Sequence, residues 1–201
     1  MKVIARGAEA IITLKNNIVT KNRIEKSYRY PDLDKKIRKL RTRSESKILQ
    51  KASKIVNVPK VINVDEKNTK IELEYIEGKR LSEYLEKTNY KKMSEKIGKG
   101  LAKLHDNNII HGDLTTSNLI LNEKKNKVYF IDFGLGFHSP RIEDKAVDLH
   151  LIKQALEAKH PTIHEGAFKS VIEGYQKSKS AKRTIEQLEK VEKRGRYKSQ
   201  Y

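Results

Sequence analysis

The residues that could do chemistry stand in two short stretches near the middle of the chain. Asp113 and Asn118 lie in the polar turn 111–118, and Asp132 follows a β-type run and precedes a Phe-Gly pair. Phosphoryl transfer needs a carboxylate that orients the attacking hydroxyl and oxygen ligands that hold Mg²⁺ against the phosphates. An H-x-D-x-x-x-x-N turn followed by D-F-G supplies them, with Asp113 as the base and Asn118 and Asp132 as metal ligands. Together the two motifs predict a site for ATP and Mg²⁺.

A lysine that neutralises the α and β phosphates is expected before these motifs, held in place by a carboxylate. Lys21 ends an apolar run where a third strand would place such a side chain. In so basic a chain a lysine is a surface residue by default, so only its position relative to the later motifs supports this role. Glu45 is the candidate partner because it begins a helical pattern, ended by Pro59, with one apolar face formed by Ile48, Leu49, Ala52, Ile55 and Val56.

A turn near the N-terminus could contact the phosphates. Apolar runs on both sides of Gly7 predict two strands, followed by a turn at Asn16-Asn17. A glycine there lets the backbone approach phosphates closely, and the candidate segment consists of Gly7, Ala8, Glu9 and Ala10. Taken alone, one glycine fits an ordinary turn better, and the segment departs from the three-glycine kinase pattern.

A hinge for the adenine ring is expected after residue 70. The runs 58–64 and 71–76 are typical of paired strands around a turn at Lys67-Asn68, and Glu77-Gly78 breaks the pattern. The backbone carbonyl of Glu74 and the amide of Ile76 would then meet the adenine edge. Because backbone contacts leave no side-chain pattern, this placement depends on the order of the elements alone.

Length and composition limit the class of protein. The chain has 201 residues, which predicts one domain with its own core. The formal net charge of +18 favours polyanionic partners, although a Lys-rich proteome would produce the same excess. The absence of cysteine excludes disulfides, thiolate metal sites and cysteine catalysis. No apolar run approaches 18 residues and no signal pattern begins the chain, so we expect a cytoplasmic protein without membrane association.

Several residues near the motifs have structural interpretations. His111 is expected to bond backbone near the turn and to hold Asp113 in place. Asp148 either bonds the backbone of that turn or lies on the surface of its helix. The segment after Gly134 lacks Ala-Pro-Glu and a long activation loop, and Gly112 replaces the arginine of many kinases, so switching by phosphorylation is not expected. A buried helical stripe is formed by Met93, Ile97, Leu101 and Leu104.

Two further segments of the chain are strongly basic, one before residue 45 and one at the C-terminal end. Tyr28-Arg29-Tyr30-Pro31 precedes a basic run over 35–43, which could contact nucleic acid or an acidic protein face, or could be a solvated helix face. From Ser178 a weak apolar stripe predicts one more helix, followed by a basic tail that contains tyrosines.

With these residues in place, the chain resembles the small atypical kinases of the KEOPS complex, which are relatives of the RIO kinases. The Tyr-Arg-aromatic-Pro segment and the His-Gly-Asp-Leu-Thr-Thr-Ser-Asn turn are specific to this family. The resemblance covers nearly the whole chain, and the segments that carry it are 7–10, Lys21 with 26–31, 41–45, 111–118, 131–135, 143–149 and 194–196.

The resemblance implies an α+β protein with a minimal two-lobed protein-kinase-like fold: a small β-rich N-lobe over 1–76, a reduced helical C-lobe over 77–192 and a basic tail over 193–201. It implies ATP and Mg²⁺ as cofactors, weak serine/threonine autophosphorylation, and an ATPase that supports threonylcarbamoylation of the adenosine next to the anticodon of certain tRNAs. The implied partners are the transferase subunit and the small regulatory subunit of the complex, and tRNA bound through the basic surface and tail. Carried over residue by residue, Asp113 is the base, Asn118 and Asp132 hold Mg²⁺, and Lys21 with Glu45 clamps the phosphates.

Other functions are weighed against this one. A stand-alone RIO-like protein kinase would transfer the γ-phosphate to a separate protein. A nucleotide-sensing scaffold need not keep Asp113, Asn118 and Asp132, which are all present. A small-molecule phosphotransferase would need an added acceptor pocket, for which so short a chain shows no segment.

Overall fold

The computed structural model describes the backbone of residues 2–196 and the side chains of residues 2–194. An antiparallel five-stranded sheet forms the N-terminal half, in the order β1-β2-β3-β5-β4. The turn between β2 and β3 is where the sequence predicts it, because Asn16 and Asn17 both adopt positive φ (50° and 59°), which asparagine tolerates. The strands are β1 (Lys2–Arg6), β2 (Ala10–Lys15), β3 (Ile18–Arg23), β4 (Val61–Asp65) and β5 (Lys70–Glu74).

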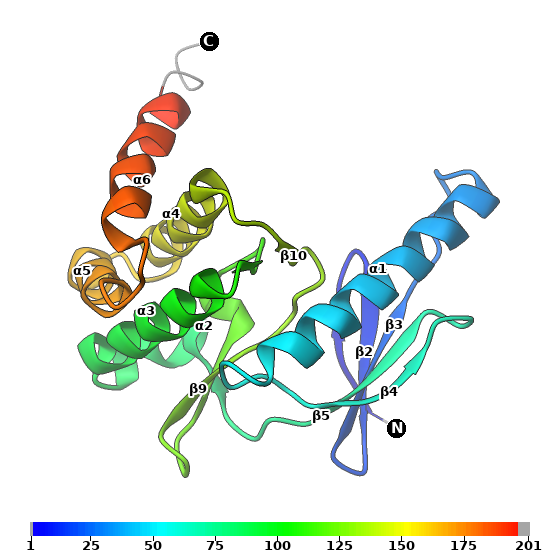
Figure 1. Cartoon of the computed structure of the whole chain (residues 1–201). Coiled ribbons are helices and arrows are strands. Elements are labelled where there is room, and N and C mark those ends of the chain that lie inside the picture. The colour runs from blue at the N-terminus through cyan, green and yellow to red at the C-terminus, as the bar shows by residue number, and fades with distance from the viewer. Residues whose placement is uncertain (1, 197–201) are drawn as a thin grey trace.

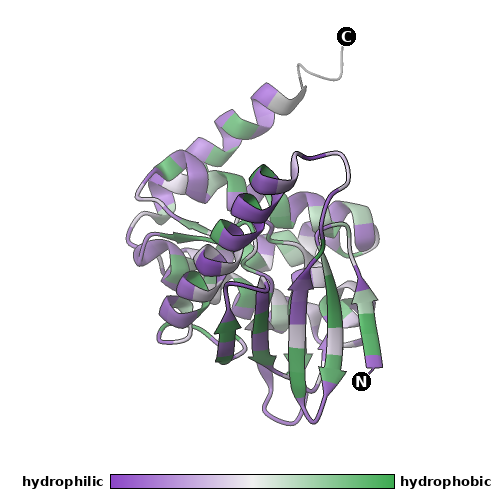
Figure 2. Cartoon of the chain, turned by 90° about the vertical axis from the view of Figure 1, so that its right-hand side faces the viewer, coloured by the Kyte–Doolittle hydropathy of each residue, from purple (hydrophilic) through white to green (hydrophobic). Residues whose placement is uncertain are grey.

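One long helix, α1 (Pro31–Ala52), lies alongside this sheet and contacts β4 and β5 (Figure 1). The prediction that the helix begins near Glu45 is wrong. The helix starts at Pro31, whose fixed φ suits a first helical position. Its first half buries polar groups instead of an apolar stripe, since the buried Asp34 carboxylate pairs with Arg38 (Nε–Oδ2 2.6 Å). Figure 2 accordingly shows hydrophilic residues along much of α1, and apolar segments in the strands.

The helix also ends earlier than Pro59. Its last residue is Ala52, and the backbone then turns, with the amides of Lys54 and Ile55 donating to carbonyls three residues back. Ile55 and Val56 still pack against the core from this turn. The apolar spacing therefore identified core residues correctly but did not separate the helix from the turn that follows it.

The chain crosses from the sheet half to a helical half between β5 and β6, over residues 75–78. Two small sheets, β10-β7 and β6-β8-β9, lie among the helices. The elements of this half are β6 (Lys79–Arg80), α2 (Leu81–Tyr84), the 3₁₀ helix η1 (Leu85–Lys87), α3 (Tyr90–Asp106), β7 (Ile109–Ile110), the 3₁₀ helix η2 (Thr116–Asn118), β8 (Leu119–Asn122), β9 (Lys127–Phe130), β10 (Phe137–His138), α4 (Ile142–Lys159), α5 (His164–Tyr175) and α6 (Ala181–Arg196).

The core of the helical half forms where α3 meets α5. A Cβ at Gly98 would overlap the Val171 carbonyl, and a Cβ at Gly174 would overlap the Glu95 carbonyl. The two helices approach this closely because both contact points lack a side chain. The predicted stripe of α3 is buried here, as Met93, Ile97, Leu101 and Leu104 are all at most 3% exposed.

The C-terminal helix α6 packs against α4 and extends away from the helical half (Figure 1). Its Glu192 accepts from Lys153 (2.8 Å), and its Arg194 donates to Glu143 (2.6 Å). Helix α6 continues to Arg196, so residues 193–196 of the predicted tail are helical. Residues 197–201 of that tail lie outside the described part of the chain. Within residues 2–196, no helix is both long and apolar enough to cross a membrane.

Candidate active site

Lys21 on β3 and Glu45 on α1 meet in the interior. Lys21 Nζ donates to Glu45 Oε1 (2.7 Å), and Arg23 Nη2 donates to Glu45 Oε2 (2.6 Å). All three side chains are buried. Lys21 and Arg23 share one face of β3 because side chains alternate along a strand. Each carboxylate oxygen of Glu45 thus holds its own cation, so Arg23 keeps Glu45 in position independently of Lys21.

Asp132 comes from the other half of the molecule and reaches the same lysine. Its Oδ1 accepts from Lys21 Nζ (2.6 Å) and from the Gly134 amide (3.1 Å). Burial alone would raise the pKa of Asp132, but the Lys21 ammonium outweighs this effect, and the pKa lies below its ordinary value. Burial alone would likewise lower the pKa of Lys21, but Glu45 and Asp132 together raise it. The pair is therefore fully ionised at neutral pH.

The turn before β8 holds Asp113 and Asn118 against each other. Asn118 Nδ2 donates to the Asp113 carbonyl (2.8 Å) and to Asp113 Oδ2 (3.0 Å). The Ile131 amide donates to the Asn118 carbonyl (3.0 Å), which places this turn beside the segment that leads to Asp132. Asp113, Asn118 and Asp132 therefore belong to one continuous group of backbone and side-chain contacts.

The oxygens of this group fit a magnesium ion that a bound nucleotide would help to hold. Among the described side chains, no cluster of three or more His, Cys, Asp and Glu could hold a metal by itself. Mg²⁺ usually takes only one or two carboxylates and completes its shell with waters and phosphates. The amide nitrogen of Asn118 donates to Asp113, which leaves the side-chain oxygen of Asn118 available to a metal ion. The Asp132 side chain is 46% exposed and is accessible to the same ion. Asn118 and Asp132 would hold the ion together with phosphate oxygens.

A buried carboxylate on α4 fixes the backbone of this turn. Asp148, 0% exposed, accepts from the amides of His111 (2.6 Å) and Gly112 (2.8 Å) and pairs with His105 Nε2 (3.2 Å). Of the two interpretations of Asp148 offered by the sequence, the structure supports the bond to the turn. Gly112 has φ of +78°, and a Cβ there would overlap the Leu135 carbonyl, so this position requires glycine.

His111 bonds backbone near the turn, as the sequence predicts, and its two contacts also link the two motifs. Its Nε2 bonds the Ile131 carbonyl (3.1 Å), which makes Nε2 the protonated nitrogen, and Nδ1 accepts from the Asp113 amide (3.3 Å). The ring also packs on Phe133 (centroids 4.5 Å apart). Burial lowers the pKa of His111 despite the nearby Asp148 carboxylate, so the ring is neutral at physiological pH.

The neutral state of His111 predicts a pH dependence of stability. The unfolded chain takes up a proton on this ring near its ordinary pKa of 6.5, whereas the folded chain does so only at lower pH. The stability is therefore fully present above about pH 6.5 and is lost as the pH falls below it. We expect the free energy of unfolding, measured by urea denaturation, to decrease between about pH 7.5 and about pH 5.

Two variants assign this slope. His111→Gln should flatten it in part, and His160, whose pKa burial also lowers, contributes a further part. His160→Gln should likewise flatten the slope in part. Equal slopes in the His111→Gln and wild-type chains would show that His111 is not held neutral by the fold.

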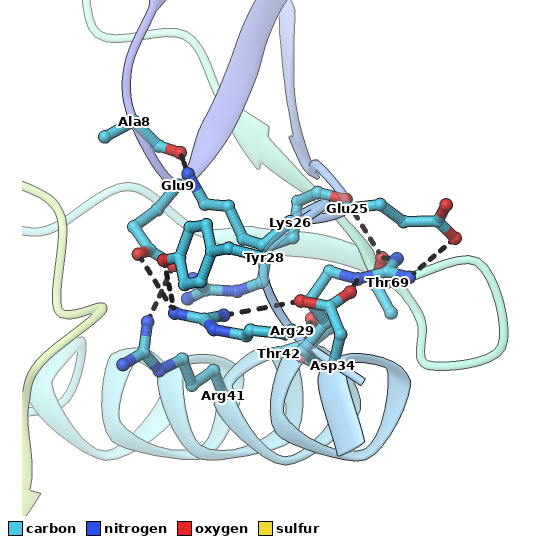
Figure 3. A network of polar contacts seen from close by, with 12 residues as sticks. Ala8, Glu9, Glu25, Lys26, Tyr28, Arg29, Asp34, Arg41, Thr42 and Thr69 are labelled. Carbon is cyan, nitrogen blue, oxygen red and sulfur yellow. Dashed lines mark hydrogen bonds and ion pairs between the residues drawn. The ribbon is translucent and has the colours of Figure 1, made fainter. Parts of the chain in front are cut away.

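The predicted phosphate loop is tied to α1 by charges (Figure 3). The Gly7 amide donates to the Ala10 carbonyl (3.0 Å) and closes the turn. Lys26 Nζ donates to the Ala8 carbonyl, and Glu9 pairs with Arg41 (2.7 Å) and with Arg29 (3.8 Å). Arginines of the basic run thus serve internal contacts: Arg38 pairs with Asp34 and Glu25, Arg41 with Glu9, and Arg43 with Glu66.

The predicted hinge residues lie at the crossing between the halves. Glu74 ends β5, and its amide donates to the Lys60 carbonyl (2.9 Å), while the Tyr75 amide donates to the Asn17 carbonyl (3.1 Å) on the opposite side. Ile76 is buried. The structure does not bring Glu74 or Ile76 into contact with the catalytic side chains, so the adenine contact stays a prediction.

Some residues of the site were not predicted as such. Arg23 could have been found from its position two residues after Lys21, which puts both on one strand face. Arg41 stands four residues before Glu45 and so shares its helix face. Nothing in the sequence indicates that Glu9 is the carboxylate that Arg41 meets, because that contact depends on how α1 lies on the sheet.

Comparison with known proteins places this geometry in a family. A protein kinase domain matches residues 6–147. The KEOPS complex subunit Bud32 of Pyrococcus abyssi is 44% identical, covering 98% of this chain and 97% of its own length. The chain belongs to the Bud32 family of protein kinases. The predicted resemblance and the predicted protein-kinase-like α+β fold are thereby confirmed.

Two other proteins are similar to this chain, one in sequence and one in fold. A probable bifunctional tRNA threonylcarbamoyladenosine biosynthesis protein of Methanobrevibacter smithii is 44% identical over 97% of this chain, which spans 36% of that longer protein. The crystal structure of the Rio2 kinase-ADP/Mg²⁺-phosphoaspartate complex from Chaetomium thermophilum has a TM-score of 0.64 and covers 98% of this chain and 72% of its own. At 14% identity, this last likeness concerns the fold alone.

Proposed function

We propose that this Bud32-family chain is a Mg-ATP-dependent kinase and ATPase that supports threonylcarbamoyladenosine formation in tRNA as a cytoplasmic subunit of a KEOPS-type complex. Weak serine/threonine autophosphorylation would accompany it. The observation that carries the proposal is the joined group of Lys21, Glu45 and Asp132, with Asp113 and Asn118 beside it. The names of the Pyrococcus and Methanobrevibacter relatives support the KEOPS and tRNA context. The partners that the resemblance implies are the transferase subunit and the small regulatory subunit.

The residues divide the work by charge. Lys21, held by Glu45, which Arg23 fixes in turn, would leave Asp132 and turn to the α and β phosphates when ATP binds. Asp113 would orient the attacking hydroxyl or water and take its proton, with Asn118 fixing its carboxylate. Bound Mg²⁺ would neutralise phosphate charge next to Asn118 and Asp132. We assign residues 1–76 to an N-lobe and 77–192 to a C-lobe of one catalytic unit, with adenine at Glu74 and Ile76 and the phosphates near 7–10.

Hydrolysis fits this chain better than transfer to a separate protein. Only residues 135–141 separate Gly134 from α4, so no long segment follows the metal-binding motif to support a peptide substrate. A stand-alone RIO-like protein kinase is the second candidate. Its support is the Rio2-like fold and an Archaeoglobus fulgidus relative described as a probable serine/threonine-protein kinase BUD32 homolog, 37% identical over 95% of this chain.

Labelled ATP separates the two candidates. We expect free phosphate from γ-labelled ATP to rise when a tRNA transcript and the transferase subunit are added, with little label on protein. An Asp132→Asn chain provides the background, because it lacks the negative charge of one predicted metal ligand. Label that accumulates on an added protein, with phosphate release indifferent to tRNA and transferase, would instead establish an ordinary protein kinase.

A further inference from the structure

A large open cavity lies away from the catalytic residues. Its volume is about 1090 Å³, and it is bounded by the C-terminal half of α1, the turn after it, the β8–β9 hairpin and β10. Lys21, Glu45, Asp113, Asn118 and Asp132 do not line it. Of the residues proposed to contact the nucleotide, only Glu74 lines it, and the Glu74 carboxylate accepts from the Lys60 amide (3.2 Å). Phosphates and a metal ion held by the other groups would therefore not occupy this cavity.

The cavity wall is positively charged. Five exposed lysines line it, and we call it the lysine groove; among the described residues the only acidic one in its wall is Glu74. None of the five ammonium groups forms an ion pair with a residue between 2 and 194, whereas the neighbouring Lys124 pairs with Glu77 (2.9 Å). The positive charge of the groove is therefore available to bind an anionic ligand. Its lysines are Lys47, Lys51, Lys54, Lys60 and Lys125.

A second cavity continues the charge toward α3. It measures about 420 Å³ and shares Ser53, Lys54, Val56 and Asn57 with the lysine groove, so the two meet at the turn after α1. No acidic residue lines it within the described chain, although Lys99 pairs with Glu95 (2.6 Å) at its edge. The lysines that it adds are Lys96, Lys99, Lys103 and Lys127.

We propose that the two cavities form one track for the phosphate backbone of an RNA. Lysines from α1, the turn after it, the β8–β9 hairpin and α3 line one continuous hollow, which suits a ligand with repeated negative charges. At the β10 end, Phe137 (42% exposed) and His138 offer ring faces on which a base can stack. The inference rests on the proposed role in tRNA modification and deepens it, because it names the surface that receives the RNA.

The competing surface is the first half of α1. Lys35, Lys36 and Lys39 are exposed there as well, but they line neither cavity, and the arginines between and after them are used in internal ion pairs. This half of the helix therefore provides a control with the same charge change on the helix that carries Lys51.

The test measures binding of an unmodified tRNA transcript to the full chain by fluorescence anisotropy at several salt concentrations. The groove variant carries Lys51→Gln, Lys54→Gln and Lys125→Gln, and the control variant carries Lys35→Gln, Lys36→Gln and Lys39→Gln. At about 0.1 M salt the groove variant should bind roughly 10- to 100-fold more weakly, with a salt slope smaller by about three, because three phosphate contacts are lost. The control should change affinity by less than about threefold.

Two further measurements separate failure of the track from failure of the fold or of the proposed function. Phosphate release from ATP without RNA should equal wild type in both variants, because none of the six lysines belongs to the ATP site. Lys51→Arg, Lys54→Arg and Lys125→Arg together should restore tRNA binding, since they restore the charge. Three outcomes would overturn the track: unchanged tRNA affinity in the groove variant, an equal loss of affinity in the control, or a wild-type chain that does not bind the transcript. Phosphate release would still test the proposed ATPase in each of these cases.

Discussion

An Asp132→Asn chain is expected to bind ATP about as well as wild type in the absence of metal and to release phosphate roughly a hundredfold or more slowly with Mg²⁺ present, because a bound metal contributes several kcal/mol of transition-state stabilisation. Asparagine is the right substitution here. Asp132 has φ of +62°, a conformation that asparagine tolerates and that costs alanine about 1–2 kcal/mol. The change thus removes the charge without straining the backbone.

The Lys21 contact makes this outcome specific. The Asp132 carboxylate now holds Lys21 Nζ at 2.6 Å, so removing its charge leaves Lys21 with Glu45 and free for the phosphates. Nucleotide affinity, measured by calorimetry with a chelator present, should therefore not fall. Asp32→Ala, which removes a carboxylate from the first turn of α1, is the control and should keep wild-type turnover. Phosphate release within about threefold of wild type in Asp132→Asn would refute the prediction that Asp132 is a metal ligand.

The sequence predicted those parts of the site that lie within one short segment. Asp113 and Asn118 are five residues apart, and a single turn joins them, so their contact follows from local structure. The turn at Asn16-Asn17 and the stripe of α3 are local in the same sense. Lys21 and Asp132 are 111 residues apart, and the order of the motifs assigned both to one site, but their direct contact was not predicted.

The sequence could not show where polar groups replace apolar ones in the core. The first half of α1 has no apolar stripe because Asp34, Arg38 and Thr42 fill the interface with the sheet, and hydrophobic periodicity does not register such a face. The lysine groove escaped notice for a related reason. Its lysines come from separate elements, and only the fold shows that they surround one cavity. Only the fold shows, too, that the neighbouring Lys124 forms an ion pair with Glu77.

Replacing Asp148 should lower both stability and turnover while leaving ATP binding intact. Its buried carboxylate accepts from the His111 and Gly112 amides and pairs with His105, so Asp148→Ala leaves buried donors without a partner. Each unsatisfied buried donor costs about 1–3 kcal/mol, so we expect the free energy of unfolding to fall by about 3 kcal/mol or more. The turn that carries Asp113 would lose its anchor, and kcat should fall. The KM for ATP should not change, because Lys21 is held by Glu45, which Arg23 fixes in the other half.

A lower kcat per folded molecule with an unchanged KM would show that Asp148 positions the turn that carries Asp113. Loss of folded protein alone would lower the active fraction and leave both parameters of the folded molecules unchanged. Asp144→Asn is the matched control on the same helix, since Asp144 accepts from Ser139 Oγ (2.6 Å) and does not contact the turn. It should cost about 1 kcal/mol of stability and leave kcat at the wild-type value. An Asp148→Ala chain with lowered stability but wild-type kcat, measured well below its melting temperature, would show that the Asp148 carboxylate stabilises α4 against the turn without setting the position of Asp113.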